Sequence, residues 1–186
     1  MATTDLYTSG SRVFREERRE VVYALEPIPF VGPADFAFLK TRAAENPKGS
    51  SRLCLHGGPQ ELLQEMIIVN QRGCYVRPHA HVGKAESFSV LEGEAIFVVF
   101  DDGGAIMHAV RMGAAASGLP FYYRIGEGVW HSLVITSDWL VFHEATEGPF
   151  LRERTRYPLW APSGADIESN RQFVQTLAPK VEAMLQ

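Results

Sequence analysis

Residues 73 to 93, GCYVRPHAHVGKAESFSVLEG, contain the residue types and spacing of a metal site. Alternate side chains of a β-strand face the same way, so His79 and His81 can point to one spot. A turn at 83–84 can lead into a second strand, on which Glu86 can face the same spot. The segment therefore predicts three metal ligands from two neighbouring strands.

A fourth ligand must come from elsewhere, and the segment GEGVWHSL offers His131 directly after a glycine-rich turn. Three imidazoles and one carboxylate suit Fe(II), Mn(II), Zn(II), Ni(II) or Cu(II) and leave open positions for water or substrate. We predict one divalent transition metal ion of one of these kinds. The alternative for His131 is a histidine packed in the core.

An all-β domain is predicted to position these residues. From about 62 to 146 the chain consists of short segments rich in Val, Ile, Phe and Tyr, separated by Gly, Asp-Gly or Pro turns. Eight such strands suit a jelly roll or small barrel. The predicted strands are 65–69, 74–79, 87–92, 94–100, 105–112, 121–125, 130–135 and 139–145.

The predicted strand 94–100, EAIFVVF, is apolar on nearly every position. The turn DDGG at 101–104 predicts that it pairs with strand 105–112. Because both of its faces are apolar, we expect its outer face to be covered by a terminal segment or by a second subunit. A homodimer is the expected assembly.

Helical or irregular segments are predicted on both sides of the strands. A helix is expected over about 34–45, and the charged run REERRE at 15–20 is expected in a solvated arm or short helix. Residues 165–186 predict a C-terminal helix that Pro179 interrupts, and GAAASG at 113–118 a flexible linker. The predicted organisation is an N-terminal arm and helix (1–48), a β-barrel (49–162) and a helical tail (163–186).

Length and composition are those of a single globular domain. The 186 residues are 46% hydrophobic and 22% charged, and the net charge of -4 gives no general attraction to nucleic acid or anionic lipid. No apolar run reaches the roughly 20 residues of a membrane helix, and the start lacks the pattern of a signal peptide. We therefore expect a cytoplasmic protein with no nucleic-acid or membrane partner. Cys54 and Cys74 are interpreted as small buried apolar side chains.

Five further residues are candidates for catalysis or ligand binding. Arg77, Lys84 and Arg124 could bind an anionic or polyhydroxylated ligand, or be solvated or ion-paired strand charges. Tyr123 could transfer a proton or only pack. Glu144 is in phase with the apolar residues of its strand, so it is either an inward general acid or base with a raised pKa or a structural carboxylate.

The chain resembles the cupin superfamily. The first cupin motif, G-x5-H-x-H-x3-4-E-x6-G, is matched at every fixed position by residues 73–93, with His79, His81 and Glu86 at the ligand places. The second motif, G-x5-P-x-G-x2-H-x3-N, is matched at Gly128 and His131. Three of its positions differ, and they hold Pro120, Gly126 and Ile135. The resemblance implies a double-stranded β-helix with one metal site.

A narrower resemblance is to the WbuC-type cupin-fold metalloproteins. The segments RLCLH, EMIIV, YVRPHAH, KAESFSVLEGE, FYYRIGEGVWHSL, VFHEATEGPF and PLWAPSG follow that family's order from about 50 to 165. The resemblance implies a role in the synthesis of surface polysaccharides and nucleotide sugars. It also implies that the ligand is a small sugar-derived molecule.

Three functions are compatible with these features. The first is a metal-dependent enzyme, such as an isomerase or epimerase, in which Glu144 or a tyrosine transfers a proton on a sugar-like substrate. The second is an Fe(II)-dependent cupin dioxygenase, which the same ligands permit. The third is a non-catalytic carbohydrate-binding or interaction module with a structural metal.

Overall fold

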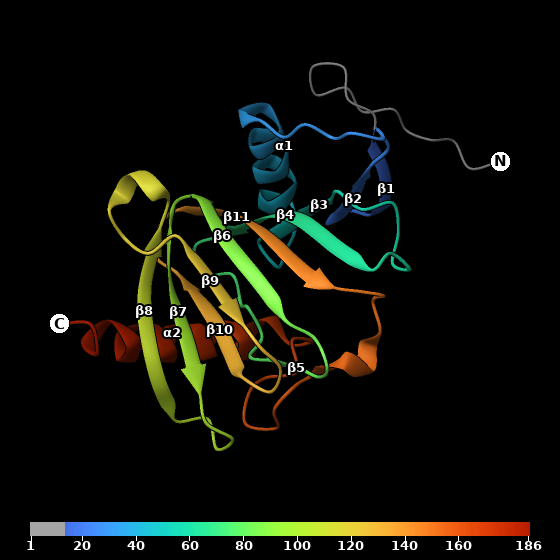
Figure 1. Cartoon of the computed structure of the whole chain (residues 1–186). Coiled ribbons are helices and arrows are strands. Elements are labelled where there is room, and N and C mark those ends of the chain that lie inside the picture. The colour runs from blue at the N-terminus through green and yellow to red at the C-terminus, as the bar shows by residue number, and fades with distance from the viewer. Residues whose placement is uncertain (1–13) are drawn as a thin grey trace.

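The computed structural model describes residues 14–186, which form two facing β-sheets, a short two-stranded ladder and two α-helices (Figure 1). The helices are α1 (Pro33–Ala44) and α2 (Ile167–Ala183), and short 3-10 turns cover Ala115–Ser117 and Arg152–Arg154. The strands are β1 (Phe14–Arg18), β2 (Val21–Ala24), β3 (Ser50–Cys54), β4 (Leu63–Gln71), β5 (Ala80–His81), β6 (Glu86–Glu92), β7 (Glu94–Phe100), β8 (Ile106–Gly113), β9 (Tyr122–Ile125), β10 (Trp130–Ile135), β11 (Trp139–Glu147) and β12 (Thr155–Arg156).

The two sheets pack face to face. The larger sheet has the order β1-β2-β3-β4-β11-β6-β9, the smaller one β10-β7-β8, and β5 pairs with β12. Phe88 and Phe142 of the larger sheet share a buried cluster with Phe97 and Leu133 of the smaller sheet. Burial of these side chains between the sheets is the main apolar contact that closes the barrel.

Alternation along the strands of the larger sheet gives it two different faces. On the outer face Ile67, Val69 and Val141 pack against Leu39 and Ala43 of α1. The side chains between them in sequence point to the barrel interior. Because β1, β2 and β3 continue this sheet, its inner face is wider than the barrel alone requires.

The C-terminal helix covers the smaller sheet. Ile96 and Val98 on the outer face of β7 are buried against Leu177 and Val181 of α2, and Figure 1 shows α2 running behind β7 and β10. The expectation that a terminal segment covers this strand is confirmed. The apolar outer face of β7 therefore no longer calls for a second subunit.

Two terminal segments differ from the predictions. The run at 15–20 lies mostly in β1, which pairs with β2, so it is neither a helix nor a loose arm. Phe14 anchors this strand in the core, and the charged residues after it are exposed, which suits an edge strand. The rest of the predicted N-terminal arm, residues 1–13, lies outside the described residues. Pro179 lies inside α2 and does not interrupt it, because the loss of one backbone hydrogen bond is outweighed by the packing of Leu177 and Val181.

The segments at 74–79 and 113–118 also differ from prediction. Residues 74–79 were expected to form a strand, but only His79 makes a bridge. Their positions are set by side-chain hydrogen bonds instead, from Ser132 Oγ to the Val76 carbonyl (2.6 Å) and from Tyr75 to the Pro162 carbonyl (2.9 Å). The segment 113–118 contains a 3-10 turn.

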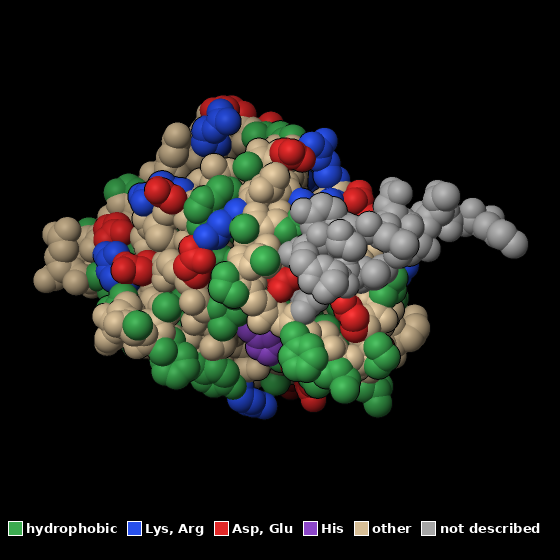
Figure 2. All heavy atoms as spheres, turned by 90° about the horizontal axis from the view of Figure 1, so that it is seen from above, with side chains coloured by type: hydrophobic (Ala, Val, Ile, Leu, Met, Phe, Trp, Pro, Cys, Tyr) green, Lys and Arg blue, Asp and Glu red, His purple; other side chains and the backbone are tan. Residues whose placement is uncertain are grey.

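Charged and apolar side chains are mixed over the surface. On the face shown in Figure 2, basic and acidic groups are interspersed, with apolar side chains between them. Neither described helix has the length and apolar character needed to cross a bilayer.

The two glycines that bound the first motif should differ in their tolerance of a side chain. Both have positive φ, +81° at Gly73 and +83° at Gly93, but a Cβ would meet no atom within 4 Å at Gly73, while at Gly93 it would lie 2.0 Å from the Trp139 carbonyl oxygen. Gly73→Ala should lower the free energy of unfolding by about 1–2 kcal/mol. Gly93→Ala should lower it further, because a backbone atom must also move. Denaturant titration measures both, and equal losses would contradict the close approach at Gly93.

Candidate metal centre and adjoining cavity

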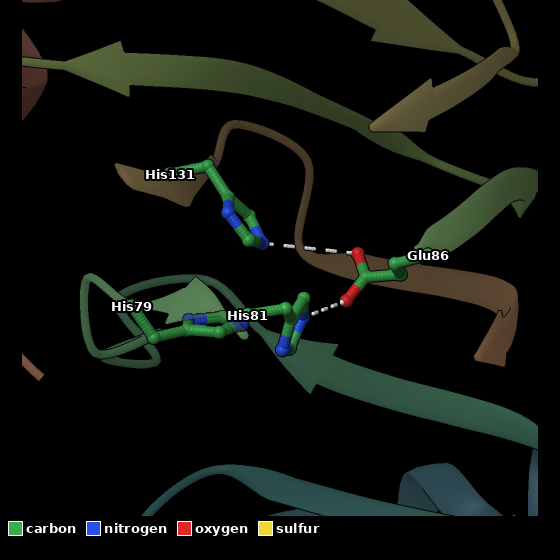
Figure 3. Close-up of side chains that lie close together, drawn as sticks. All are labelled: His79, His81, Glu86 and His131. Atoms are coloured by element: carbon green, nitrogen blue, oxygen red, sulfur yellow. Dashed lines mark hydrogen bonds and ion pairs between the residues drawn. The ribbon is translucent and has the colours of Figure 1, made fainter. Parts of the chain in front are cut away.

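The structure brings together the four residues that the sequence predicts as metal ligands. His79, His81, Glu86 and His131 each offer one ligand atom, and these atoms all lie within 4.8 Å of one another (Figure 3). His81 and Glu86 come from β5 and β6, His131 comes from β10, and His79 directly precedes β5. Side chains from both sides of the barrel therefore meet at one point.

Backbone hydrogen bonds hold His79 beside His131. The amide of each residue donates to the carbonyl of the other, at 3.1 and 2.9 Å, and their ring centroids are 4.2 Å apart. Nδ1 of His79 lies 2.8 Å from the carbonyl of Arg77, and Nδ1 of His131 lies 2.9 Å from that of Val129. A proton on each Nδ1 satisfies these contacts and leaves each Nε2 as a lone pair, the form that ligates metals.

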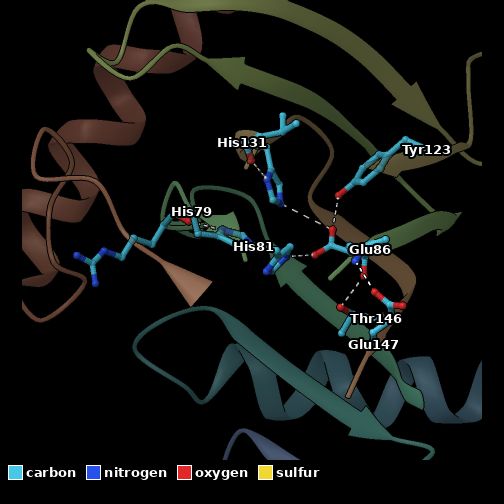
Figure 4. A network of polar contacts seen from close by, with 10 residues as sticks. His79, His81, Glu86, Tyr123, His131, Thr146 and Glu147 are labelled. Atoms are coloured by element: carbon cyan, nitrogen blue, oxygen red, sulfur yellow. Dashed lines mark hydrogen bonds and ion pairs between the residues drawn. The ribbon is translucent and has the colours of Figure 1, made fainter. Parts of the chain in front are cut away.

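Glu86 connects the imidazoles to Tyr123 of β9, the strand beside β6 in the larger sheet (Figure 4). Its Oε2 lies 2.7 Å from Nε2 of His81, and its Oε1 lies 3.8 Å from Nε2 of His131 and accepts a 2.9 Å hydrogen bond from the Tyr123 hydroxyl. Tyr123 therefore orients the carboxylate.

The donor set fits a divalent transition metal ion. Nε2 of His131 and Nδ1 of His81 are buried and have no hydrogen-bond partner among the described residues. A buried polar atom without a partner is unfavourable, and a cation shared by nitrogen lone pairs and one carboxylate would satisfy it. The four residues are thus a group that could hold a metal ion.

The ionisation states agree with this role. Burial lowers the pKa of His79 to about 3, with a further contribution from His131, and burial also lowers the pKa of His131. Burial alone would raise the pKa of Glu86, but the hydrogen bond from His81 and the other nearby histidines lower it to about 2. At neutral pH His79 and His131 are therefore neutral and the carboxylate is ionised, as metal ligation requires.

A cavity of about 740 Å³ extends from this cluster along the inner face of the larger sheet. From His79, His81 and Glu86 it runs over β11 and β4 to β3 and β2. Its walls are both apolar and polar, as Ile68 and Phe142 line it together with Gln64 and Asn70. Its size is within the roughly 300–1,000 Å³ of small-molecule sites.

Glu144 lies on the wall of this cavity. It stands in β11 between Met66 of β4 and Phe88 of β6. Burial and the negative charge of Glu86 raise the pKa of Glu144 to about 8, although Arg52 and Lys84 act in the opposite direction. At neutral pH most molecules of the protein therefore carry a proton on Glu144.

The other predicted site residues are distributed differently. Lys84 and Arg77 line the cavity; Lys84 is buried, and the Arg77 guanidinium stacks on Tyr157 at 4.1 Å. Burial raises the pKa of Tyr123 well above its ordinary value, so it acts as a hydrogen-bond donor to Glu86 rather than as a ready proton acceptor. Arg124 is exposed and lines a separate, smaller hollow. Glu86 also lines that hollow, but Arg124 is not among the residues that line the larger cavity.

Several cavity residues were not identified from the sequence. Arg52 and His56 line the cavity from β3 and the loop after it, and the alternation in RLCLH was the available signal for Arg52. Thr146 donates to the carbonyl of Ala85 (2.9 Å), and Glu147 accepts from the amide of Ala85 (2.8 Å). These two bonds fix the start of β6 and so the position of Glu86 (Figure 4).

Comparison with known proteins supports the fold. Residues 32–112, less than half of the chain, match a family model described as Domain of unknown function (DUF6016). A search of curated protein sequences found no match. Protein SO0799 from Shewanella oneidensis superposes with a TM-score of 0.52 at 11% identity, over 80% of this chain and 98% of that one. With the two facing sheets and the ligands at their open end, this likeness confirms the predicted fold class.

The chain has a cupin fold, the double-stranded β-helix. Two further structures are similar over a smaller share of the chain. A Klebsiella pneumoniae protein described as having a double-stranded β-helix domain gives a TM-score of 0.46 at 11% identity, over 59% of this chain and 79% of that one. Oxalate decarboxylase from Bacillus subtilis gives 0.46 at 18% identity, over 58% of this chain but only 27% of the decarboxylase. These likenesses concern the fold, and the WbuC-type assignment stays a prediction.

The raised pKa of Glu144 predicts a pH-dependent stability. Between its unfolded pKa near 4.5 and its folded pKa of about 8, the folded state binds more protons than the unfolded state, so the free energy of unfolding falls as pH rises. Glu144→Gln removes this titration. In chelator-treated protein the variant should lose less stability than the wild type between about pH 5 and pH 8, by on the order of 2 kcal/mol, since the open cavity reduces the full effect.

Denaturant titrations at each pH measure this difference. Glu153→Gln, at an exposed position in the 3-10 turn Arg152–Arg154, is the control and should keep the wild-type slope. Equal slopes for the wild type and Glu144→Gln would show that Glu144 does not hold a proton in the folded state.

Proposed function

We propose that this protein binds one divalent transition metal ion through His79, His81, Glu86 and His131 and acts on a small polar metabolite in the adjoining cavity. The observation that carries the proposal is the convergence of three imidazoles and one carboxylate, with buried ring nitrogens that lack partners, at the end of a cavity of about 740 Å³.

The arrangement favours proton transfer beside the metal. When bound, the ion would supply a Lewis acid that polarises a substrate oxygen. Glu144 shares the same cavity and is half-protonated near pH 8, so it can donate or accept a proton close to neutral pH. Tyr123 keeps Glu86 oriented. These roles support an isomerase or epimerase type of reaction.

A sugar-derived ligand agrees with the cavity lining. Gln64, Asn70 and Arg77 offer hydrogen-bonding groups, and Phe142 and Ile68 offer apolar surface on which a ring could lie. A role in surface polysaccharide synthesis depends on the WbuC-type resemblance and is part of the proposal. The homodimer is likewise a proposal.

Metal content tests the proposal directly. Purified protein should contain close to one transition metal ion per chain, measured by inductively coupled plasma mass spectrometry. Single alanine variants of His79, His81, Glu86 and His131 should each weaken metal binding by at least about tenfold, since each removes a ligand. His143→Ala is the matched control because His143 pairs with Glu65 away from the cluster.

A protein that binds no transition metal, or a His131→Ala variant with unchanged metal affinity, would overturn the assignment of the four ligands. Oxygen uptake separates this proposal from a dioxygenase. The protein is loaded with Fe(II) without oxygen and then mixed with sugar-derived candidates in oxygenated buffer. It should consume no oxygen if the reaction is a proton transfer.

A further inference from the structure

The most unusual charge on the cavity wall is the ammonium group of Lys84. Lys84 is only 8% exposed and lines the cavity, yet it makes no hydrogen bond or ion pair with any residue that the structure describes. Most of the side chain is buried, but its ammonium nitrogen is not among the buried atoms that lack a partner, so it reaches the cavity. An ammonium that faces a cavity without an ion pair can bind an anion through a charge-assisted hydrogen bond. We propose that the ligand of this cavity carries an acidic group, a carboxylate or a phosphate, that binds Lys84.

The carboxylates around Lys84 are engaged elsewhere. Glu86 is held by His81 and Tyr123, and Glu147 accepts the amide of Ala85. Glu144, Glu86 and Glu147 act on Lys84 through longer-range charge, and no ion pair joins any of them to it. The other cation of this region, Arg154, donates to the Gly83 carbonyl and adds positive charge beside Lys84. A ligand anion would supply the direct ion pair that these carboxylates do not make.

The backbone holds Lys84 in place before any ligand binds. Gly83, at φ +61°, donates its amide to Glu127 (2.7 Å), and Ala85 donates to Glu147 (2.8 Å). The backbone on both sides of Lys84 is thus fixed, so the turn itself needs little ordering when an anion binds.

The place of Lys84 also restricts the ligand. Lys84 lies in the turn that joins β5 to β6, between the ligand residues His81 and Glu86. An acidic group bound there lies beside the metal cluster, so the same molecule can present a hydroxyl or carbonyl oxygen to the metal only if that oxygen is close to the acid. Hydroxy or oxo acids and small sugar phosphates have this chemistry. This narrower class rests on the proposed function, whereas anion binding by Lys84 does not.

The experiment measures the midpoint of thermal unfolding with glycolate, inorganic phosphate or neutral glycerol, with chloride keeping the ionic strength constant. It is run on the protein as purified and after treatment with a chelator, because a bound metal could itself attract anions. Glycolate or phosphate should raise the wild-type midpoint by roughly 3–5 °C at ten times its dissociation constant. Glycerol should not produce this rise.

Lys84→Met keeps the length and apolar stem of the side chain and removes the charge. It should fold at least as stably as the wild type, keep the wild-type metal content and lose the anion-dependent rise. Lys180→Met, on the exposed face of α2, is the matched control and should respond like the wild type.

A response to glycolate alone identifies a carboxylate, a response to phosphate alone identifies a phosphate, and either supports the proposal. It is overturned if neither anion stabilises the chelator-treated wild type, or if Lys84→Met keeps the full rise. Loss of metal binding with an intact anion response would refute the metal site only.

Discussion

The mutual backbone hydrogen bonds between His79 and His131 are the constraint on which the site depends. The two residues belong to motifs that are far apart in sequence, and β10, which carries His131, lies in the smaller sheet. By pairing with β10 at this one residue, the otherwise irregular segment before β5 is held across the open end of the barrel. The rings of His79 and His131 then lie side by side, and β5 and β6 add His81 and Glu86.

The division of the larger sheet into two faces explains why the site has a cavity beside it. Helix α1 buries the outer face, so Leu53 and Val69 can be apolar there. The inner face continues past the barrel onto β3 and β2, where the smaller sheet does not cover it. Arg52 and Asn70 line the cavity along this uncovered part. The same alternation that builds the core thus also builds the binding surface.

The sequence predicted those features that depend on local geometry. The spacing of His79, His81 and Glu86 needs only strand alternation and a short turn, and the apolar character of β7 was sufficient to indicate a covering segment. The segment 74–79 was predicted wrongly, because its partners Ser132 and Pro162 are distant in sequence. The charged strand β1 was missed for a similar reason, since its pairing with β2 outweighs its polar composition.

The sequence could not predict the role of a side chain when that role depends on its neighbours on the adjacent strand. Tyr123 was predicted as a catalytic candidate, and only the register of β9 against β6 shows that its hydroxyl reaches Glu86. Arg124, one residue later, must then point to the opposite face, away from the cluster. The choice between these two neighbours is a matter of strand phase, which a shift of one residue would reverse.

Electrostatic coupling through Glu144 connects the metal cluster to the rest of the cavity. The charge of Glu86 contributes to the raised pKa of Glu144, whereas Lys84 lowers that pKa. A cation held by the cluster would offset the charge of Glu86 and favour loss of the proton from Glu144. An anion at Lys84 would offset the ammonium charge and favour retention of that proton. The metal ion and the anion at Lys84 would therefore act on the pKa of Glu144 in opposite directions, so the protonation of Glu144 depends on which of the two sites is filled.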